Sequence, residues 1–291
     1  MEVSEFFLGH TQCLNILGCD LAQLMKAKTA SGFGTIGDKM SHTDFDKRMK
    51  QYEGCYRIQF PRKSYVILRI DGRAFHSYTK GMEKPFDEGL IEGMHHAALK
   101  TCEDISGAKF GYVQSDECSI LMHDRDAIET EPWFDNKLQK IVSVAASIYT
   151  AHFNSVMFEQ VVGVLAYFDA RAFILPPEEV VNYFIWRQQD ATRNSISGLA
   201  HSKYGPRQLH AKNSNEMQDM LMLEHGINWN DLLTHLKRGA SLFRKEVTGP
   251  LPDNVPEHVR QSVGEVTRNV WHVDLEMPIL TQDRKYVTRW L

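Results

Sequence analysis

The sequence has no hydrophobic run long enough to cross a membrane. It opens with MEVSEFF, which carries Glu2 and Glu5 where a secretory signal has positive charge. Its five cysteines are scattered without a C-x-x-C pair, which argues against a zinc site or a disulfide framework. The formal net charge is −4, so contact with nucleic acid requires a local basic face. We therefore expect a cytoplasmic chain with no membrane partner.

Common nucleotide-binding and metalloprotease patterns are also missing. There is no G-x-x-x-x-G-K-[ST] and no H-E-x-x-H, which excludes a Walker-type ATPase and a zincin. Gly32, Gly34 and Gly37 do spell G-x-G-x-x-G, but that pattern binds a dinucleotide only between a strand and a helix. The preceding AQLMKAKTAS is not a strand, so this segment is interpreted as a linker.

The remaining pattern predicts an α+β fold, with helices packed on an antiparallel or mixed sheet. We expect a flexible extension over residues 1–39, a catalytic domain over 40–245, and a tail of uncertain structure over 246–291. A helix is expected after Ser41 or Thr43. The other expected helices are 87–105, 134–153, one from Pro177 onward, 214–225 and 229–238; the expected strands are 64–70, two within 109–124, 164–176 and one in WHVDLEMPIL.

Two acidic positions follow or join predicted strands. Asp71 ends the strand SYVILRI, and Asp116-Glu117 occupy the turn within 109–124. If these strands are neighbours, the carboxylates of Asp71 and Asp116 converge, and such a pair is stable when a cation lies between them. Mg²⁺ prefers oxygen ligands, and Gly72 lets the backbone approach closely enough to offer its carbonyl. Each acid alone is more simply explained as a strand end or a turn residue.

Basic residues follow both acidic positions. Lys84 follows the first, and Lys137 and Lys140 follow the second, which are the side chains that a triphosphate requires. Acids and lysines together favour two-metal phosphoryl or nucleotidyl transfer.

These residues resemble those of a known family, the tRNA-His guanylyltransferases and the related 3′-to-5′ polymerases that add nucleotides to tRNA 5′ ends. The resemblance covers roughly residues 41–245 and runs in the family's order. Its motifs are RIDGRAFH (69–76), KPFD (84–87), GYVQSDECSILM (111–122), WF followed by Lys137 and Lys140, FDAR (168–171), YFIWRQQDATRN (183–194) and GINWND (226–231).

The resemblance implies a polymerase-palm-like domain with two Mg²⁺ ions and with ATP and GTP as substrates. Asp71, Gly72 and Asp116 are implied to bind the metals, and Glu117 is implied to be a supporting catalytic acid beside Asp71 and Asp116. The implied triphosphate site comprises Asp71, Gly72, Arg73, Ala74, Phe75, His76, Lys84, Ser115, Asp116, Lys137 and Lys140. The implied tRNA contacts are Arg187, Gln188, Asp190, Asn194 and Lys212, although Asn215-Glu216 also matches the element of Lys212. A homodimer or homotetramer is implied as well.

One departure from the family concerns substrate choice. Strict eukaryotic guanylyltransferases carry His-Ile-Asn-Asn where this chain has Thr192-Arg193-Asn194-Ser195. The missing histidine favours relatives that repair truncated tRNA 5′ ends by templated addition. Two alternatives remain open at this point: a palm-like nucleotidyl cyclase, and an RNA-binding relative without catalysis.

Overall fold

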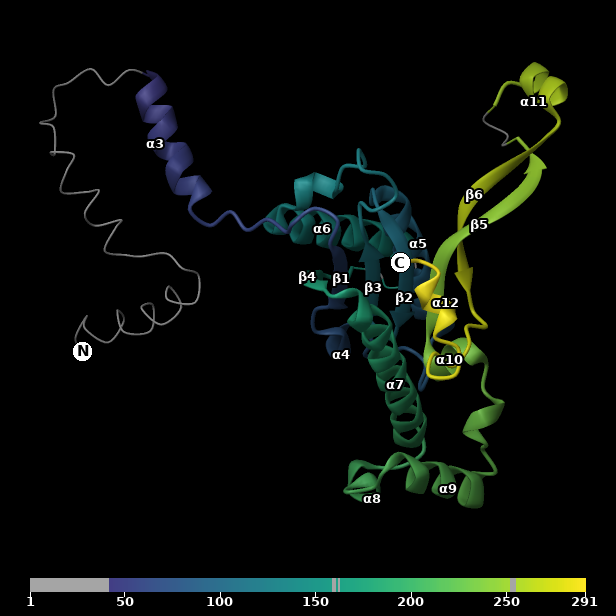
Figure 1. Ribbon diagram of the computed structural model, residues 1–291. Helices are drawn as coiled ribbons and strands as arrows, with labels where there is room; N and C mark the ends of the chain where they lie inside the picture. The colour runs from purple at the N-terminus through teal and green to yellow at the C-terminus, as the bar shows by residue number, and fades with distance from the viewer. Residues whose placement is uncertain (1–41, 159–160, 162, 252–254) are drawn as a thin grey trace, which may run out of the picture. The chain divides into compact units, whose positions relative to one another are not determined.

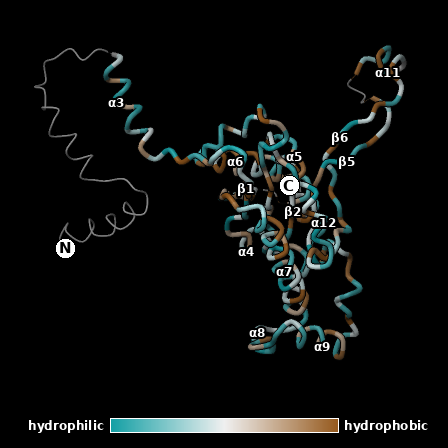
Figure 2. The backbone as a smooth tube through the Cα atoms, in the orientation of Figure 1, coloured by the Kyte–Doolittle hydropathy of each residue, from teal (hydrophilic) through white to brown (hydrophobic). Residues whose placement is uncertain are grey.

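The computed structural model describes residues 42–158, 161, 163–251 and 255–291 (Figure 1). The expected extension over residues 1–39 lies outside the described residues. The chain divides into two units, residues 1–56 and 57–291, and each is described by itself. In the first unit, α3 (His42–Gly54) confirms the helix expected there, and its trace is mainly hydrophilic (Figure 2).

The second unit is built on a six-stranded sheet in which every neighbouring pair is antiparallel, in the order β4-β1-β3-β2-β5-β6. This confirms the α+β fold. The strands are β1 (Tyr65–Gly72), β2 (Ala108–Gln114), β3 (Glu117–Met122), β4 (Phe168–Leu175), β5 (Ala240–Pro250) and β6 (Glu265–Asp274).

Helices cover both faces of the sheet (Figure 1). The longer helices are α5 (Glu88–Asp104), α6 (Leu138–Met157), α7 (Pro177–His201) and α9 (Ser214–His225). The shorter ones are α4 (Phe75–Tyr78), the 3-10 turn Trp133–Asn136, α8 (Pro206–Leu209), the 3-10 turn Trp229–Asp231, α10 (Thr234–Arg238), α11 (Glu257–Val263) and α12 (Lys285–Thr288). The helix expected over 229–238 is thus two short turns instead of one helix.

Strand β1 shows how the core is divided. Successive side chains of a strand point to opposite faces, and Val66, Leu68 and Ile70 enter the cluster beneath α5 and α6. Tyr65 and Ile67 enter the cluster beneath α7 and the C-terminal segment. Because both faces are covered, the strand is apolar on both sides apart from Arg69 and Asp71.

The chain beyond residue 245, whose structure the sequence left open, belongs to the sheet. Strand β5 pairs with β2 only over Ala240–Phe243, while β6 pairs with β5 along its whole length. The distal part of the β5–β6 hairpin is therefore a two-stranded ribbon. After it, Met277, Leu280 and Val287 return to the core beneath α7.

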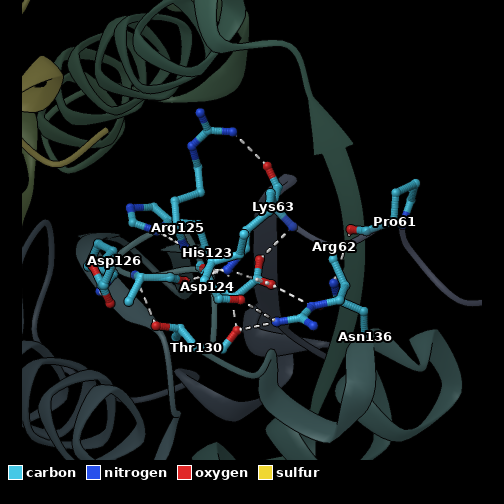
Figure 3. A network of polar contacts seen from close by, with 12 residues as sticks. Pro61, Arg62, Lys63, His123, Asp124, Arg125, Asp126, Thr130 and Asn136 are labelled. Carbon is cyan, nitrogen blue, oxygen red and sulfur yellow. Dashed lines mark hydrogen bonds and ion pairs between the residues drawn. The ribbon is translucent and has the colours of Figure 1, made fainter.

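A buried carboxylate holds one end of the sheet together (Figure 3). Asp124, just after β3, accepts the backbone N–H of Lys63 at 2.7 Å and lies 3.5 Å from Arg62 Nε. Arg125 donates to the carbonyl of Lys63 at 2.8 Å. These contacts fix the entry of β1 and lie at the opposite end of the strands from Asp71.

Candidate active site

The structure brings the two acidic positions together at one end of the inner strands β1 and β3. This row of strand ends is called the catalytic edge of the sheet. Strands β1 and β3 are neighbours, with Asp71 directly opposite Glu117. Ser115 and Asp116 form the tight turn from β2 to β3, and the Gly72 N–H donates to the carbonyl of Asp116 at 2.9 Å. Ser115 has φ of +50°, a left-handed conformation uncommon for a residue with a Cβ. The convergence expected from the sequence is therefore present.

The Asp116 carboxylate is partly buried beside Asp71. Ser115 Oγ donates to its Oδ1 at 3.0 Å. Burial raises the pKa of Asp116, and the neighbouring Asp71 carboxylate adds to that rise. Arg171, on β4, places a guanidinium nitrogen 3.8 Å from Asp71 Oδ2 while it binds Asp169 at 3.2 Å. The edge therefore holds two carboxylates that are only weakly neutralised by the protein.

The loop after β1 is held by one aromatic ring. Phe75 is buried, with its ring centroid 5.0 Å from that of Phe168 and 5.7 Å from that of Phe153. A Cβ on Gly72 would lie 2.3 Å from Cδ2 of Phe75, so only glycine allows this approach. Ala74 adopts φ of +55°, and Arg73, Ala74 and His76 are exposed. The loop thus presents its backbone beside the carboxylates.

Of the three lysines assigned to the triphosphate, Lys84, Lys137 and Lys140, only Lys84 lies in the loop before α5, and its side chain is exposed there. Among the described residues it has no ion-pair partner. The neighbouring Asp87 caps α5 by accepting the Leu90 N–H at 2.9 Å.

Lys137 and Lys140 lie elsewhere, which corrects their assignment to this site. Lys137 is the N-cap of α6 and Lys140 lies in its first turn. At this helix start the Leu138 N–H donates to the carbonyl of Ile58 at 3.0 Å, and the Asn136 side chain donates to the carbonyl of Pro61 at 3.1 Å. That is the end of the sheet that carries Asp124. The far part of α6, at Phe153, packs on the Phe75 loop, and the helical rise separates Lys140 from Phe153 by about 20 Å. Within one chain these lysines do not reach Asp71.

Glu117 faces the protein interior and is only 4% exposed. Arg187 donates to both of its oxygens at 2.7 and 2.6 Å, and Arg69 approaches Oε2 at 2.7 Å. Burial raises the pKa of Glu117, and the two guanidinium groups oppose that rise. Its carboxylate is fully engaged, so it braces the β3 end of the site and does not project toward a substrate.

The proposed RNA contacts on α7 separate into buried and exposed residues. Arg187 and Gln188 are buried, and Gln188 bonds to Pro278 and Leu280 at 2.9 and 2.8 Å. Because both are buried, the structure corrects the expectation that Arg187 and Gln188 contact tRNA directly. Asp190 joins Arg187 to Arg193, each at 2.8 Å. Asn194 is exposed. Lys212 lies just before α9 and not on α7, and its Nζ pairs with Glu216 Oε1 at 3.1 Å.

Sequence reasoning missed Arg69 and Arg171. A signal existed for Arg69, because it is a charged residue within the otherwise apolar run of β1 and such a residue needs a buried partner. Arg171 belongs to the quoted motif FDAR (168–171), but nothing in that motif indicated its position beside Asp71. Among the described residues there is no group of three or more His, Cys, Asp or Glu side chains arranged to hold a metal. In the same part of the chain, no helix is long and apolar enough to span a bilayer.

Comparisons with known proteins agree with this architecture. The family model described as tRNAHis guanylyltransferase matches residues 46–176. A bacterial tRNA(His) guanylyltransferase-like protein in complex with ATP is 46% identical, with a TM-score of 0.75, and the match covers 84% of this chain and 98% of that one. The structure of such a protein in complex with GTP matches with 44% identity, a TM-score of 0.70 and the same coverage.

A curated sequence adds to this. The tRNA(His) guanylyltransferase of Saccharomyces cerevisiae is 29% identical over 205 residues, which are 62% of this chain and 83% of the relative. Sequence, fold and the order of the motifs point the same way: the chain belongs to the tRNA(His) guanylyltransferase family of nucleotidyltransferases.

Proposed function

We propose that this protein adds nucleotides to the 5′ end of tRNA, in the 3′-to-5′ direction, after ATP-dependent activation of that end. The observation that carries the proposal is the convergence of Asp71 and Asp116 at one sheet edge, beside a loop that exposes its backbone. The bacterial relative is found in complex with ATP and with GTP, which supports these nucleotides as substrates.

The donor groups of this edge fit Mg²⁺. Two carboxylates and a backbone carbonyl are hard oxygen ligands, and Mg²⁺ commonly takes one or two protein carboxylates together with substrate phosphates. The unfavourable proximity of Asp71 to the buried Asp116 is what a dication would relieve. We propose that Asp71, Gly72 and Asp116 hold two Mg²⁺ ions with the nucleotide. Mg²⁺, when bound, supplies charge neutralisation at the reacting phosphates.

The exposed loop is proposed to receive the triphosphate. Arg73, Ala74 and His76 are exposed in the loop beside Asp71, and Lys84 supplies a cation that has no ion-pair partner among the described residues. Ser115 is exposed in the turn that carries Asp116, and its hydroxyl donates to the Asp116 carboxylate. These groups bind and orient phosphate oxygens, so they position the reacting phosphorus against the attacking oxygen.

The proposed reaction has two displacements. In the first, an oxygen of the tRNA 5′-monophosphate attacks the α-phosphorus of ATP, and pyrophosphate leaves. In the second, the 3′-hydroxyl of the incoming nucleotide attacks the tRNA 5′-phosphorus, and AMP leaves. Both are phosphoryl-transfer steps in which positioning and charge stabilisation do most of the work.

More specifically, we propose that the tRNA substrate has a truncated 5′ end, which the protein repairs. Thr192 takes the place of the histidine in strict guanylyltransferases, and it lies on α7 just before the exposed Asn194. Asn194, Asp190 and Lys212 remain candidates for RNA contact, whereas the buried Arg187 and Gln188 are proposed to position α7. Assembly as a homodimer or homotetramer and a cytoplasmic location stay predictions.

The test offers labelled full-length tRNA-His and a tRNA lacking its first nucleotide, with ATP, Mg²⁺ and all four nucleotides. We expect Mg²⁺-dependent incorporation, with greater efficiency on the truncated tRNA. Asp116→Asn serves as the inactive variant and Asp126→Asn, at the other end of the sheet beside Lys109, as its matched control. Salt-sensitive tRNA binding without incorporation would contradict the proposal. A cyclic product from a triphosphate alone would point to a cyclase instead.

A further inference from the structure

A cavity of about 260 Å³ lies beside the Ser115–Asp116 turn. Its walls come from α5 and the loop before it, the end of β2, the second half of α7, and α10. The lining residues that matter most for its chemistry are Phe86, His95, Gln114, Ser115, Gly198 and His235. No residue of the loop Gly72–Tyr78 lines it, so it is distinct from the proposed triphosphate loop.

The cavity contains buried polar atoms without partners. Gln114 is only 6% exposed, and its side-chain oxygen has no hydrogen-bond partner among the described residues. The same holds for Nδ1 of His235. An unsatisfied buried polar atom destabilises the fold, so such atoms in a cavity indicate that a ligand completes them. Gln114 also carries an amide N–H₂, so the wall offers both an acceptor and a donor.

Among the described lining residues, no side chain offers a positive charge to the cavity. Burial lowers the pKa of His95 to about 4, with a smaller effect from His235, and burial also lowers the pKa of His235. Both imidazoles are therefore neutral near pH 7. Asp87 is the one acid in the wall, and it accepts the backbone N–H groups of Leu90 and Glu83 at 2.9 and 3.1 Å. A phosphate group has no cation to meet here.

Apart from Ser115, Asn194 and Ser195, the other lining residues are mainly apolar and include Phe86. A purely apolar chain would leave the Gln114 amide unsatisfied, and a sugar would place its hydroxyls against Leu90, Met94 and Leu236. A flat heteroaromatic ring with edge donors and acceptors satisfies both features. The volume is just under the roughly 300–1,000 Å³ of sites for whole drug-sized ligands, which suits one ring system and part of a sugar.

The position relates this cavity to the catalytic edge. Ser115 lines it and also donates to the Asp116 carboxylate at 3.0 Å. We propose that the cavity receives the nucleobase of a nucleotide whose phosphate lies at the Asp71–Asp116 edge, with Gln114 and His235 bonding to the edge of the base. The nucleotide is either a free nucleoside triphosphate or the unpaired 5′-terminal nucleotide of the RNA. The inference rests on the proposed function for the identity of this ligand.

Gly198 offers a direct test. Gly198 lines the cavity, and a Cβ at this position meets no atom within 4 Å, so a larger side chain is accommodated there without a clash. Gly198→Leu fills the cavity without crowding the protein, and Gly198→Ala is the matched control that keeps most of the volume. Gln114→Met keeps the size of the side chain and removes the amide. His96→Leu, next to His95 on α5 but outside the cavity, controls for changes to that helix.

Binding is measured in two arms, each comparing a ligand with and without its base. One arm uses Mg²⁺-GTP against ribose 5′-triphosphate. The other uses an RNA duplex with one unpaired 5′ guanosine against the same duplex with an abasic 5′ residue. We expect the base to strengthen wild-type binding at least tenfold in one arm, which identifies the source of the ligand. Gly198→Leu and Gln114→Met should reduce this gain to less than threefold, while Gly198→Ala and His96→Leu retain it.

Two results overturn the inference. One is a wild-type protein that gains nothing from the base in either arm. The other is a base-dependent gain that survives in both folded cavity variants, as judged by thermal unfolding. Because both arms measure binding, they are scored independently of nucleotide transfer. Absence of incorporation in wild type contradicts the proposed function and leaves this comparison intact.

Discussion

Arg187 donates to both carboxylate oxygens of Glu117, at 2.7 and 2.6 Å, across the interface between α7 and the sheet. Both residues are only 4% exposed, so the pair lies in the interior directly behind the Asp116 turn. Arg69 and Asp190 extend the contact into a network of four charges. Such a network fixes where α7 meets the edge of the sheet.

Removing one member of this network should destabilise the fold. We expect Arg187→Ala to lower the free energy of unfolding by about 3 kcal/mol, because it leaves Glu117 buried with Arg69 as its remaining partner. Urea denaturation measures the change. Arg193→Ala is the matched control, since Arg193 is exposed and binds only Asp190, and it should cost less than about 1 kcal/mol. Equal effects for the two variants would contradict a structural role of the buried pair.

Gly72 should not tolerate even one added carbon. A Cβ there would lie 2.3 Å from Cδ2 of Phe75, and the ring cannot move freely because it packs against Phe153 and Phe168. We expect Gly72→Ala to cost roughly 1–3 kcal/mol of stability through overpacking and to displace the loop beside Asp71. The double variant Gly72→Ala with Phe75→Leu should recover part of the stability. Unchanged unfolding and unchanged nucleotide affinity in Gly72→Ala would show that the loop adapts.

Local sequence patterns predict part of this architecture. The apolar run of β1, the turn at Ser115–Asp116 and the helix from Pro177 are short-range signals, and each is confirmed. Strand β5 was missed because only its first residues are buried, and the rest is an exposed ribbon without regular alternation.

The partners within the site depend on distances between strands and helices that no local pattern encodes. Lys137 and Lys140 were placed by their order after Asp116, yet order along the chain does not give the direction in which α6 runs. Arg187 was assigned to RNA from the family resemblance of its motif, and its carboxylate partner lies 70 residues away in the sequence. Burial of that kind follows from tertiary packing alone.

The ionised Asp116 carboxylate should lower the free energy of unfolding when no metal is bound. Its pKa is raised mainly by burial, so the folded state holds the proton more tightly than the unfolded state. The ionised carboxylate therefore destabilises the fold above the unfolded pKa of about 3.9, and the effect disappears below it. Without Mg²⁺, we expect Asp116→Asn to be at least as stable as wild type at pH 7. Thermal unfolding between pH 3 and pH 8 measures this.

The same group should set the acid limit of Mg²⁺ binding. Only the ionised carboxylate binds the dication, so affinity for Mg²⁺ falls as pH drops through the raised pKa of Asp116. We expect nucleotide transfer to drop more than 100-fold in Asp116→Asn and in Asp71→Asn at pH 7, with the fold retained. Transfer within tenfold of wild type in either variant would rule out the assignment of that carboxylate.

The three lysines provide a final comparison, because two of them lie at the wrong end of the sheet. Lys84 is exposed in the loop before α5, whereas Lys140 stacks over Phe134 at 4.7 Å near the start of α6. We expect Lys84→Ala to raise the nucleotide KM about tenfold, the equivalent of roughly 1.4 kcal/mol of lost triphosphate contact, with a smaller change in kcat. Lys140→Ala should leave both constants within twofold of wild type. Steady-state kinetics over a range of Mg²⁺-nucleotide concentrations separates the two constants. A raised KM in Lys140→Ala alone would mean that the triphosphate site is completed by a second copy of the chain and not by Lys84.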